Sequence, residues 1–280
     1  VITHYNGQSS ADAYRNRLER LGIKVYRHYT IEGYPHNVAL IDSDEGFGKN
    51  DYVETTRPLV IVTAPGPGSG KMAVCLSQLY QENKKGVKAG YAKFETFPVW
   101  NLPLKHPVNK AYEAATADLN DVNMIDPYHL EAYGETAISY NRDTEIFPVL
   151  DALFTGIYGH NPYKSPTDMG VNMVGFCMED DEACCQASKQ EIIRRYYHAL
   201  NDFANGDISE AVVNRIGRLF KQVGISTADR PTTTAANERK DRSSALAVAA
   251  IELHDGHIIT AEASPLLGSS AALLLNATKY

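Results

Sequence analysis

The ten residues from Thr63 to Met72, TAPGPGSGKM, carry the sharpest chemical signal in the chain. Glycines let backbone amides point at an anion with no β-carbon in the way, and a lysine at a helix start adds positive charge. The segment follows an apolar run and precedes an expected helix over Met72–Glu82, which is the strand–loop–helix context of a P-loop. The sequence therefore predicts phosphate binding by the turn residues, which are Gly66, Gly68, Ser69, Gly70 and Lys71.

The match to the P-loop pattern G-x-x-x-x-G-K-[ST] departs at two positions. Pro65 stands at the first glycine position, and Met72 stands where the hydroxyl that holds Mg²⁺ is expected. Ser69 is a hydroxyl that could take that role. These departures argue against standard ATP hydrolysis and leave phosphate binding open. The alternative interpretation is a structural glycine–proline turn with Lys71 at the surface.

Asp42 ends another apolar run, Val38–Ile41, and is a further candidate for the same site. If this run and Leu59–Val62 are parallel strands of one sheet, Asp42 lies on the carboxyl edge beside Gly66, where α/β proteins bind ligands. An acid there could hold a metal or a ribose. The alternative, a turn aspartate leading into a polar glycine-containing stretch, is the interpretation that we favour.

A second set of polar residues falls in the loop-rich stretch 88–145, and loops at a sheet edge often carry function. This possible second site consists of Lys93, Asn101, His106, Asp126 and His129. Asp126 and His129 are three residues apart, so a short helix would place them on one side, where they could do acid–base work or bind metal. The alternative is that Asp126 caps a helix that starts at Pro127, with His129 at the surface.

The remaining reactive residues define no site by themselves. Cys184 and Cys185 fall in the first turn of an expected helix over Asp180–Phe203, where the helix dipole favours a thiolate and the neighbouring acids oppose it, so we predict no nucleophile. The sequence contains no H-E-x-x-H, G-x-S-x-G or G-x-G-x-x-G motif and predicts no metal site. These residues determine neither a cofactor nor whether the protein is an enzyme.

Composition narrows the class of protein. The chain has 280 residues, a net charge of −7 and 44% hydrophobic residues, as expected of a globular protein of about two domains. The acidic balance gives no overall reason to bind nucleic acid or anionic lipid. The four cysteines form no C-x-x-C pair, and no apolar run approaches a membrane-spanning length. We expect a cytoplasmic protein with a phosphorylated small molecule as partner and no nucleic-acid or membrane partner. A homo-oligomer is compatible with this composition.

Hydrophobic periodicity predicts an α/β fold that begins with a Rossmann-like region over residues 1–95. Short apolar runs alternate there with helical spacing, and runs of this kind suit parallel strands covered on both faces. The expected strands of this parallel sheet are Ile23–Tyr29, Val38–Ile41 and Leu59–Val62.

The rest of the chain divides into three further stretches. Residues 96–225 are expected to be mainly helical, and the polar, threonine-rich residues 226–244 predict a linker or mobile loop. Residues 245–280 predict a β-hairpin and a helix that begin an incomplete α+β module, because Asp255-Gly256 favours the positive backbone angles of a hairpin turn.

Five strings along the chain closely resemble one family. They are Thr63–Met72, Lys93–Pro98, Asn101–Pro107, Asn123–Pro127 and Lys164–Asn172. On these strings the chain is identified as a member of an uncharacterised bacterial family, catalogued as domain of unknown function 1846. The resemblance spans essentially the whole chain. It implies a cytoplasmic bacterial protein and an interior portion of a longer member, and it supplies no catalytic residues.

Three functions follow as hypotheses. In the first, the degenerate P-loop-like turn binds a nucleotide or a phosphorylated metabolite, and the second set of polar residues contacts the rest of that molecule. In the second, the chain is a non-catalytic assembly or ligand-binding protein in which the glycine turn is structural. The third is an ATP-driven peptidase, a name that some members of the family carry; the missing hydroxyl after Lys71 and the lack of a protease motif argue against it.

Overall fold

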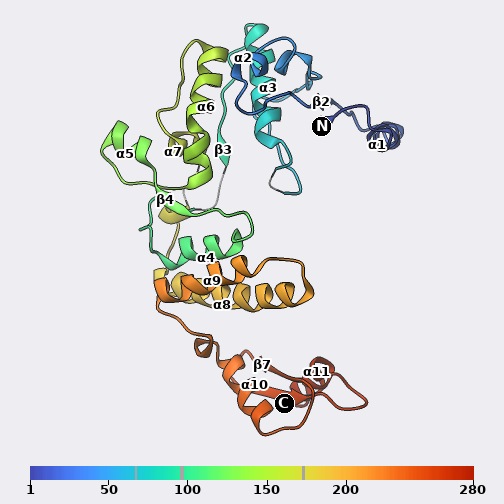
Figure 1. The fold of residues 1–280 in the computed structure, drawn as a ribbon, viewed down its shortest axis with the longest axis vertical. Helices are drawn as coiled ribbons and strands as arrows, with labels where there is room; N and C mark the ends of the chain where they lie inside the picture. The colour runs from blue at the N-terminus through green and yellow to red at the C-terminus, as the bar shows by residue number, and fades with distance from the viewer. Residues whose placement is uncertain (67, 95–97, 172–173) are drawn as a thin grey trace. The chain divides into compact units, whose positions relative to one another are not determined.

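The computed structural model describes residues 1–66, 68–94, 98–171 and 174–280. These residues form eleven α-helices, three 3₁₀ helices and eight short strands, so the mixed α/β class is confirmed (Figure 1). They divide into two compact units, residues 1–96 with 124–173 and residues 97–123 with 174–280, which we describe one at a time. Some positions that the sequence analysis singled out lie outside the described residues. They are Pro67 of the glycine turn, the expected boundary at residue 95, and positions 96–97 and 172 of the family strings.

The first unit combines short helices with three two-stranded sheets. Its helices are α1 (Ser9–Arg20), α2 (Val38–Ile41), α3 (Lys71–Lys84), α5 (Pro127–Tyr133), α6 (Asn141–Tyr158), α7 (Pro166–Met169) and the 3₁₀ helix η1 (Phe47–Lys49). Its strands are β1 (Ile2–Tyr5), β2 (Arg27–Tyr29), β3 (Lys93–Phe94), β4 (Asn123–Ile125, which begins at the unit boundary), β5 (Ile138–Tyr140) and β6 (Gly170–Val171). Strand β1 pairs with β2 and β3 with β6, both in parallel, and β4 pairs with β5.

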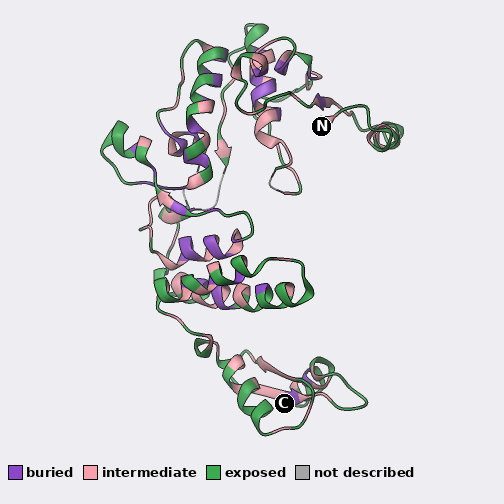
Figure 2. Ribbon diagram, in the orientation of Figure 1, coloured by how far each residue is buried: buried purple, intermediate pink, exposed green. Residues whose placement is uncertain are grey.

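The core of the first unit lies between α3 and α6. Leu76 and Leu79 of α3 pack with a row of apolar side chains from α6, and Phe47 of η1 and Ile41 of α2 complete the cluster. Figure 2 shows buried stretches on both of these helices. The core therefore joins residues from both segments of the chain that make up this unit.

Two of the three strands expected in the Rossmann-like sheet are not formed, whereas residues Arg27–Tyr29 of the third form β2 and pair in parallel with β1. Val38–Ile41 is one turn of helix, begun by Asn37, whose side chain accepts a hydrogen bond from the amide of Leu40. Leu59, Val60 and Ile61 form no strand and are 77%, 51% and 81% exposed. A four-residue apolar run has no periodicity that separates strand from helix, and a strand needs a neighbour that no described residue supplies here.

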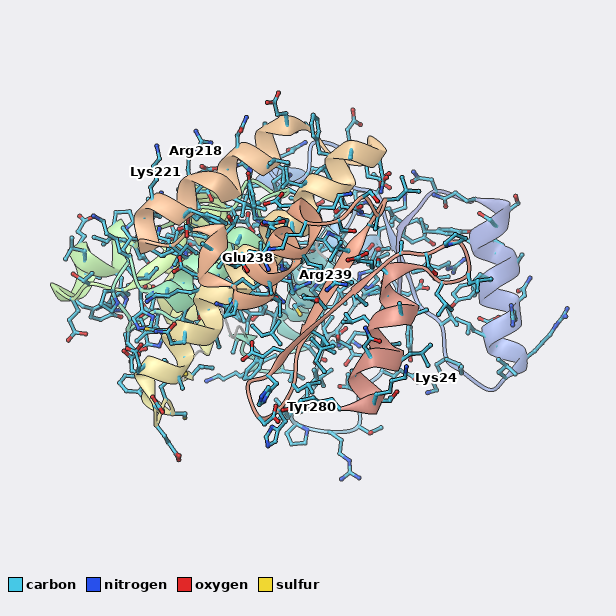
Figure 3. All side chains as sticks on the ribbon, turned by 90° about the horizontal axis from the view of Figure 1, so that it is seen from below. Lys24, Arg218, Lys221, Glu238, Arg239 and Tyr280 are labelled. Atoms are coloured by element: carbon cyan, nitrogen blue, oxygen red, sulfur yellow. The ribbon has the colours of Figure 1, made fainter. Side chains whose placement is uncertain are left out.

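Three helices form the core of the second unit. They are α4 (Pro107–Ala115), α8 (Asp181–Asn205) and α9 (Glu210–Val223), with the 3₁₀ helix η2 (Val174–Phe176) preceding α8. Ile192 of α8 packs with Ile216 and Leu219 of α9, and the exposed Arg218 and Lys221 point away from this stripe (Figure 3). The helical middle region is thus an amphipathic packing of three helices.

The last part of the second unit contains η3 (Thr227–Asp229), α10 (Pro231–Asp241), β7 (Val248–Glu252), β8 (Ile258–Glu262) and α11 (Ser269–Lys279). The expected hairpin is confirmed, because β7 pairs antiparallel with β8 and Gly256 in the turn has a φ of +83°. Residues 226–244 are largely helical in place of the expected loop. Their start signals are a capping box between Ser226 and Asp229, and a proline in the first turn of α10.

Candidate functional site

The glycine turn leads directly into α3, and the helix begins without a side-chain cap. Gly68 and Gly70 have φ values of +71° and +86°, which lie in the left-handed region that favours glycine. Gly70 is the N-cap, and its carbonyl accepts the first helical bond, from Val74. Among the described residues, the amides of Lys71, Met72 and Ala73 find no acceptor. These unpaired amides give the turn the donors and the positive helix end that an anion needs.

The cation of the turn lies against the loop itself. The Lys71 ammonium donates to the Gly66 carbonyl over 2.8 Å and to Ser69 Oγ over 3.3 Å. Ser69 Oγ donates to the same carbonyl over 2.6 Å, and the hydroxyl of Thr3 on β1 donates to the Ser69 carbonyl over 3.1 Å. The loop is therefore closed on its own lysine, and β1 holds it from outside. Thr3 is a contact that the sequence analysis missed, because 66 residues separate it from Ser69.

Met72 has a structural reason to stand where a P-loop carries a hydroxyl. Its side chain packs against the core cluster between α3 and α6. A serine or threonine there would place a polar group against that apolar surface and leave a gap in it. The departure from the P-loop pattern thus follows from the packing of α3.

The sequence predicted that Asp42 and Gly66 share the carboxyl edge of a parallel sheet. This sheet edge does not exist in the described residues, because neither Val38–Ile41 nor Leu59–Val62 is a strand. A β-carbon added at Gly156 of α6 would lie 1.9 Å from Asp42 Oδ2, so the carboxyl group is seated on that helix. Asp42 Oδ1 is buried and has no partner among the described residues. Burial raises the pKa of Asp42, since the charged form loses hydration without gaining a cation.

Asp126 and His129 do not form a pair with each other. Asp126 is fully buried and caps α5: its Oδ1 accepts from the amides of Tyr128 and His129, and its Oδ2 accepts from the amide and hydroxyl of Thr167. The His129 ring lies 3.0 Å from Ser165 Oγ through Nδ1 and is 8% exposed. The capping interpretation of Asp126 is therefore confirmed, whereas His129 lies inside the unit and not at its surface.

Lys93 is also engaged within the first unit. Its ammonium donates to the Tyr140 hydroxyl over 2.5 Å, lies over the ring of that tyrosine, and forms an ion pair with the buried Asp143 at the start of α6. This lysine therefore joins β3 to β5 and α6. These contacts give Lys93 a structural role that requires no ligand.

Asn101 and His106 lie in the second unit. Asn101 Oδ1 is buried without a partner among the described residues, and a β-carbon at Gly175 would approach it to 2.0 Å. His106 Nε2 lies 3.0 Å from Asp181 Oδ1 and 3.6 Å from Cys185 Sγ. The second set of predicted residues is thus divided between the two units. His106 meets a carboxylate and a thiol from α8, and no local sequence pattern indicated either contact.

Cys185 is not an activated nucleophile. Burial, and after it the charges of Asp181 and Glu182, raise the pKa of its thiol above the ordinary value. In a Cys–His–Asp relay, the thiol and the carboxylate face opposite nitrogens of the imidazole. Here both face Nε2, while Nδ1 accepts a bond from the amide of Val108.

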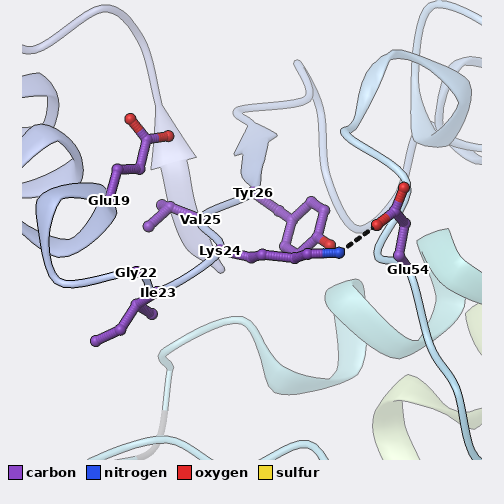
Figure 4. Close-up of a pocket in the computed structure, with 7 residues that line it drawn as sticks. All are labelled: Glu19, Gly22, Ile23, Lys24, Val25, Tyr26 and Glu54. Carbon is purple, nitrogen blue, oxygen red and sulfur yellow. Dashed lines mark hydrogen bonds and ion pairs between the residues drawn. The ribbon is translucent and has the colours of Figure 1, made fainter.

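A surface pocket of about 440 Å³ in the first unit contains none of the predicted residues. It is lined by Glu19, Gly22, Ile23, Lys24, Val25, Tyr26 and Glu54. In Figure 4 the Lys24 side chain extends to Glu54, with which it forms an exposed ion pair of 2.5 Å. An exposed pair of this kind contributes little binding energy, so we do not assign this pocket a function.

These features define a mixed α/β protein with a glycine-rich, uncapped helix start, and in the described part of the chain no helix has the length and apolar character of a membrane span. Residues 1–224 match domain of unknown function DUF1846, N-terminal, and residues 228–280 match its C-terminal counterpart. The chain therefore belongs to the DUF1846 family.

Bacterial proteins named UPF0371 are similar to the chain over nearly all of its length. The chain is 61% identical over 270 residues to a UPF0371 protein of Corynebacterium urealyticum, a match that covers 96% of this chain and 54% of the relative. It is 58% identical over 279 residues to UPF0371 proteins of Streptococcus pneumoniae and Streptococcus thermophilus, covering 100% of this chain and 56% of each relative. The chain thus spans about half the length of the curated relatives it matches.

Proposed function

We propose that the chain binds the phosphate group of a nucleotide or a phosphorylated metabolite at the turn from Gly66 to Lys71. The observation that carries this proposal is the uncapped start of α3, where the amides of Lys71, Met72 and Ala73 find no acceptor among the described residues. A bound phosphate would accept from these amides and lie at the positive end of the helix dipole. Gly68 and Gly70 support it, since their positive φ values shape the loop.

The proposal is one of binding and assigns no reaction. Ser69, the nearest hydroxyl to the position that holds Mg²⁺ in a P-loop, donates to the Gly66 carbonyl, and Met72 is part of the core. Hydrolysis of ATP by the P-loop mechanism would need a hydroxyl ligand for the metal that these residues do not offer. That Asp42 and the second set of polar residues contact the rest of the ligand stays a prediction.

A specific observation also favours the second hypothesis, in which the turn is structural. Lys71 already has acceptors in the Gly66 carbonyl and Ser69 Oγ, and Thr3 holds the Ser69 carbonyl. These bonds stabilise the loop without any ligand. In that case the protein is an assembly or ligand-binding protein whose function lies elsewhere on its surface.

Replacing Lys71 by alanine separates the two hypotheses. The change removes the charge and keeps the backbone donors, so affinity for ATP, ADP or a sugar phosphate should fall by about tenfold to a hundredfold, the equivalent of roughly 1.5–3 kcal/mol. The free energy of unfolding should change by about 0.5 kcal/mol or less. Isothermal titration calorimetry measures the affinity, and urea unfolding measures the stability.

Lys84→Ala is the matched control for this experiment. Lys84 ends the same helix, is exposed, and pairs with Asp44, so its removal should leave ligand affinity as it is. If Lys71→Ala binds every phosphorylated ligand as the unchanged protein does, or if neither protein binds any, the phosphate proposal is wrong. A Lys71→Ala protein that is strongly destabilised supports the structural turn.

We also propose that the protein is cytoplasmic. Its partner in this proposal is a phosphorylated small molecule and not a nucleic acid. The four cysteines support a reducing compartment, since all are free thiols. The net charge of −7 supports the exclusion of nucleic acid, because it disfavours non-specific phosphate-backbone contacts. Self-association into a homo-oligomer is compatible with these features, and sedimentation of the purified protein would decide it.

A further inference from the structure

Three side chains that carry metal-ligating atoms converge at one point of the second unit. His106 is the N-cap of α4, and Asp181 and Cys185 are the first and fifth residues of α8. Asp181 and Cys185 share a face of α8 because they are four residues apart. The packing of α4 against α8 brings the imidazole to that face. The glycine turn belongs to the other unit, so this cluster is independent of the phosphate proposal.

The distances between the donor atoms of these three side chains suit a small tetrahedral ion. His106 Nε2 lies 3.0 Å from Asp181 Oδ1, and Cys185 Sγ lies 3.6 Å from Nε2 and 3.8 Å from Asp181 Oδ2. Zinc bonds of about 2.0–2.1 Å to nitrogen and oxygen and about 2.3 Å to sulfur place neighbouring ligand atoms roughly 3.3–3.6 Å apart in a tetrahedron. Each pair of side chains therefore already has donor atoms near the spacing that coordination requires. The imidazole faces Oδ1 of Asp181 and the thiol faces Oδ2, so the carboxylate must turn, or bind through both oxygens, when the ion enters.

We propose that His106, Asp181 and Cys185 bind a divalent transition-metal ion, and specifically Zn²⁺. One imidazole nitrogen, one carboxylate oxygen and one thiolate form a ligand set that zinc accepts, whereas Mg²⁺ and Ca²⁺ prefer oxygen ligands alone. Three protein ligands leave a fourth tetrahedral position for water or a small ligand. The side chain of His106 is 10% exposed and that of Asp181 is 66% exposed, so an ion can enter from solvent on the carboxylate side.

The surroundings of the cluster favour a cation in spite of the helix start. The dipole of α8 places partial positive charge at its N-terminus, which opposes a metal ion. Asp180 and Glu182 flank Asp181 and add two negative charges to those of the ligands. A groove of about 340 Å³ between α4 and α8 lies farther along the two helices, and none of the three cluster residues lines it.

Metal binding has a local consequence at the start of α4. Nδ1 of His106 accepts a 3.3 Å bond from the amide of Val108, so the imidazole proton lies on Nε2 when no ion is bound. An ion on Nε2 moves that proton to Nδ1 and ends this bond. Two donors then face each other at Nδ1, so the start of α4 must adjust when the ion binds; the bond that is given up is long for its type.

Titration of the purified, chelator-treated chain with Zn²⁺ and with Co²⁺ tests the site. We expect a single ion per chain, and a thiolate-to-cobalt charge-transfer absorption with Co²⁺. Loss of an outer partner of a metal ligand already weakens binding by about 10–100-fold, so Cys185→Ser should weaken zinc binding by at least about 100-fold and abolish that absorption. Cys184→Ser is the matched control, because the neighbouring thiol lies outside the cluster and should be dispensable.

Alkylation of the unchanged protein provides a test that does not depend on the folding of a variant. Zn²⁺ should slow the reaction of Cys185 with iodoacetamide and leave the exposed Cys177 unaffected, as read by peptide mass spectrometry. The proposal would be overturned if Cys185 reacted with iodoacetamide at the same rate with and without Zn²⁺. It would also be overturned if the cobalt absorption survived in Cys185→Ser and disappeared in Cys184→Ser. Binding in both variants with the affinity of the unchanged protein would overturn it as well.

Discussion

At the scale of single residues, the environment of a side chain separates interpretations that its type leaves open. Asp126 was a candidate for acid–base chemistry and also a candidate helix cap. Its carboxylate accepts from two amides of α5 and from the amide and hydroxyl of Thr167, so each oxygen has two donors. A buried carboxylate so fully engaged stabilises the junction of α5 and α7 and has no free lone pair directed at a ligand.

Replacing Asp126 by alanine should therefore affect stability and leave ligand binding as it is. The change leaves buried donors unpaired and removes a cap, so we expect the free energy of unfolding to fall by roughly 2–3 kcal/mol in urea denaturation. Asp126→Asn, which keeps one cap oxygen, should lose less. A folded Asp126→Ala protein with nearly unchanged stability and weakened phosphate affinity would instead return Asp126 to the binding site.

At the scale of elements, an ion-pair network on α8 makes the stability of the protein depend on pH. Glu191 accepts from Arg194, three residues on, and from Arg195, four residues on. The hydrogen bonds from Arg194 and Arg195 outweigh the effect of burial and lower the pKa of Glu191 to about 2 from 4.5. Because the folded pKa is below the unfolded one, this carboxylate contributes stability that is present above pH 4.5 and is lost as the pH falls toward about 2.

Glu191→Gln should consequently reduce stability at neutral pH by about 1 kcal/mol, a value discounted because the side chain is one-third exposed and solvent screens the pair. The difference from the unchanged protein should disappear between pH 4.5 and about 2. Chemical unfolding at a series of pH values measures it. Glu238→Gln on α10, where the ion pair with Arg242 is exposed and 3.8 Å long, is the control and should show almost no difference at any pH. A constant Glu191→Gln difference at all pH values would contradict the assignment.

At the scale of the whole molecule, the compact units do not follow the sequence as continuous stretches. The first unit is interrupted by residues 97–123 and completed by residues 124–173. Its core needs Leu76 and Leu79 from the first segment and α6 from the second. A region that the sequence indicates as a separate α/β domain is thus only part of a unit.

A fragment of residues 1–96 should therefore fail to fold by itself. Without α6 the apolar side of α3 loses most of its packing partners and keeps mainly Ile41 and Phe47, and burial of apolar surface is the main favourable term in folding. We expect low helicity by circular dichroism and no cooperative transition in urea, whereas a fragment of residues 1–173 should show one. A cooperative transition in the shorter fragment would show that α3 finds its core without α6.

Sequence by itself determined the features that depend on neighbours within about four residues. The helix over Pro127–Tyr133 with its Asp126 cap, the helix after the glycine turn and the hairpin at Asp255-Gly256 are of this kind, and all are confirmed. Caps, glycine turns and helical periodicity act through local bonds, so their residue types are sufficient to predict them. The family strings also predicted membership in DUF1846 correctly.

Tertiary structure decided what depends on distant partners. Val38–Ile41 became a helix, and Leu59–Val62 found no strand among the described residues to pair with, because a strand exists only through its neighbours' backbone groups. His106 and Asp181 meet across 75 residues through the packing of α4 on α8, which no local pattern encodes. Local hydrogen bonds determine whether a short segment forms a helix or a turn. Which elements then meet depends on how their apolar faces are buried together, and that burial is non-directional.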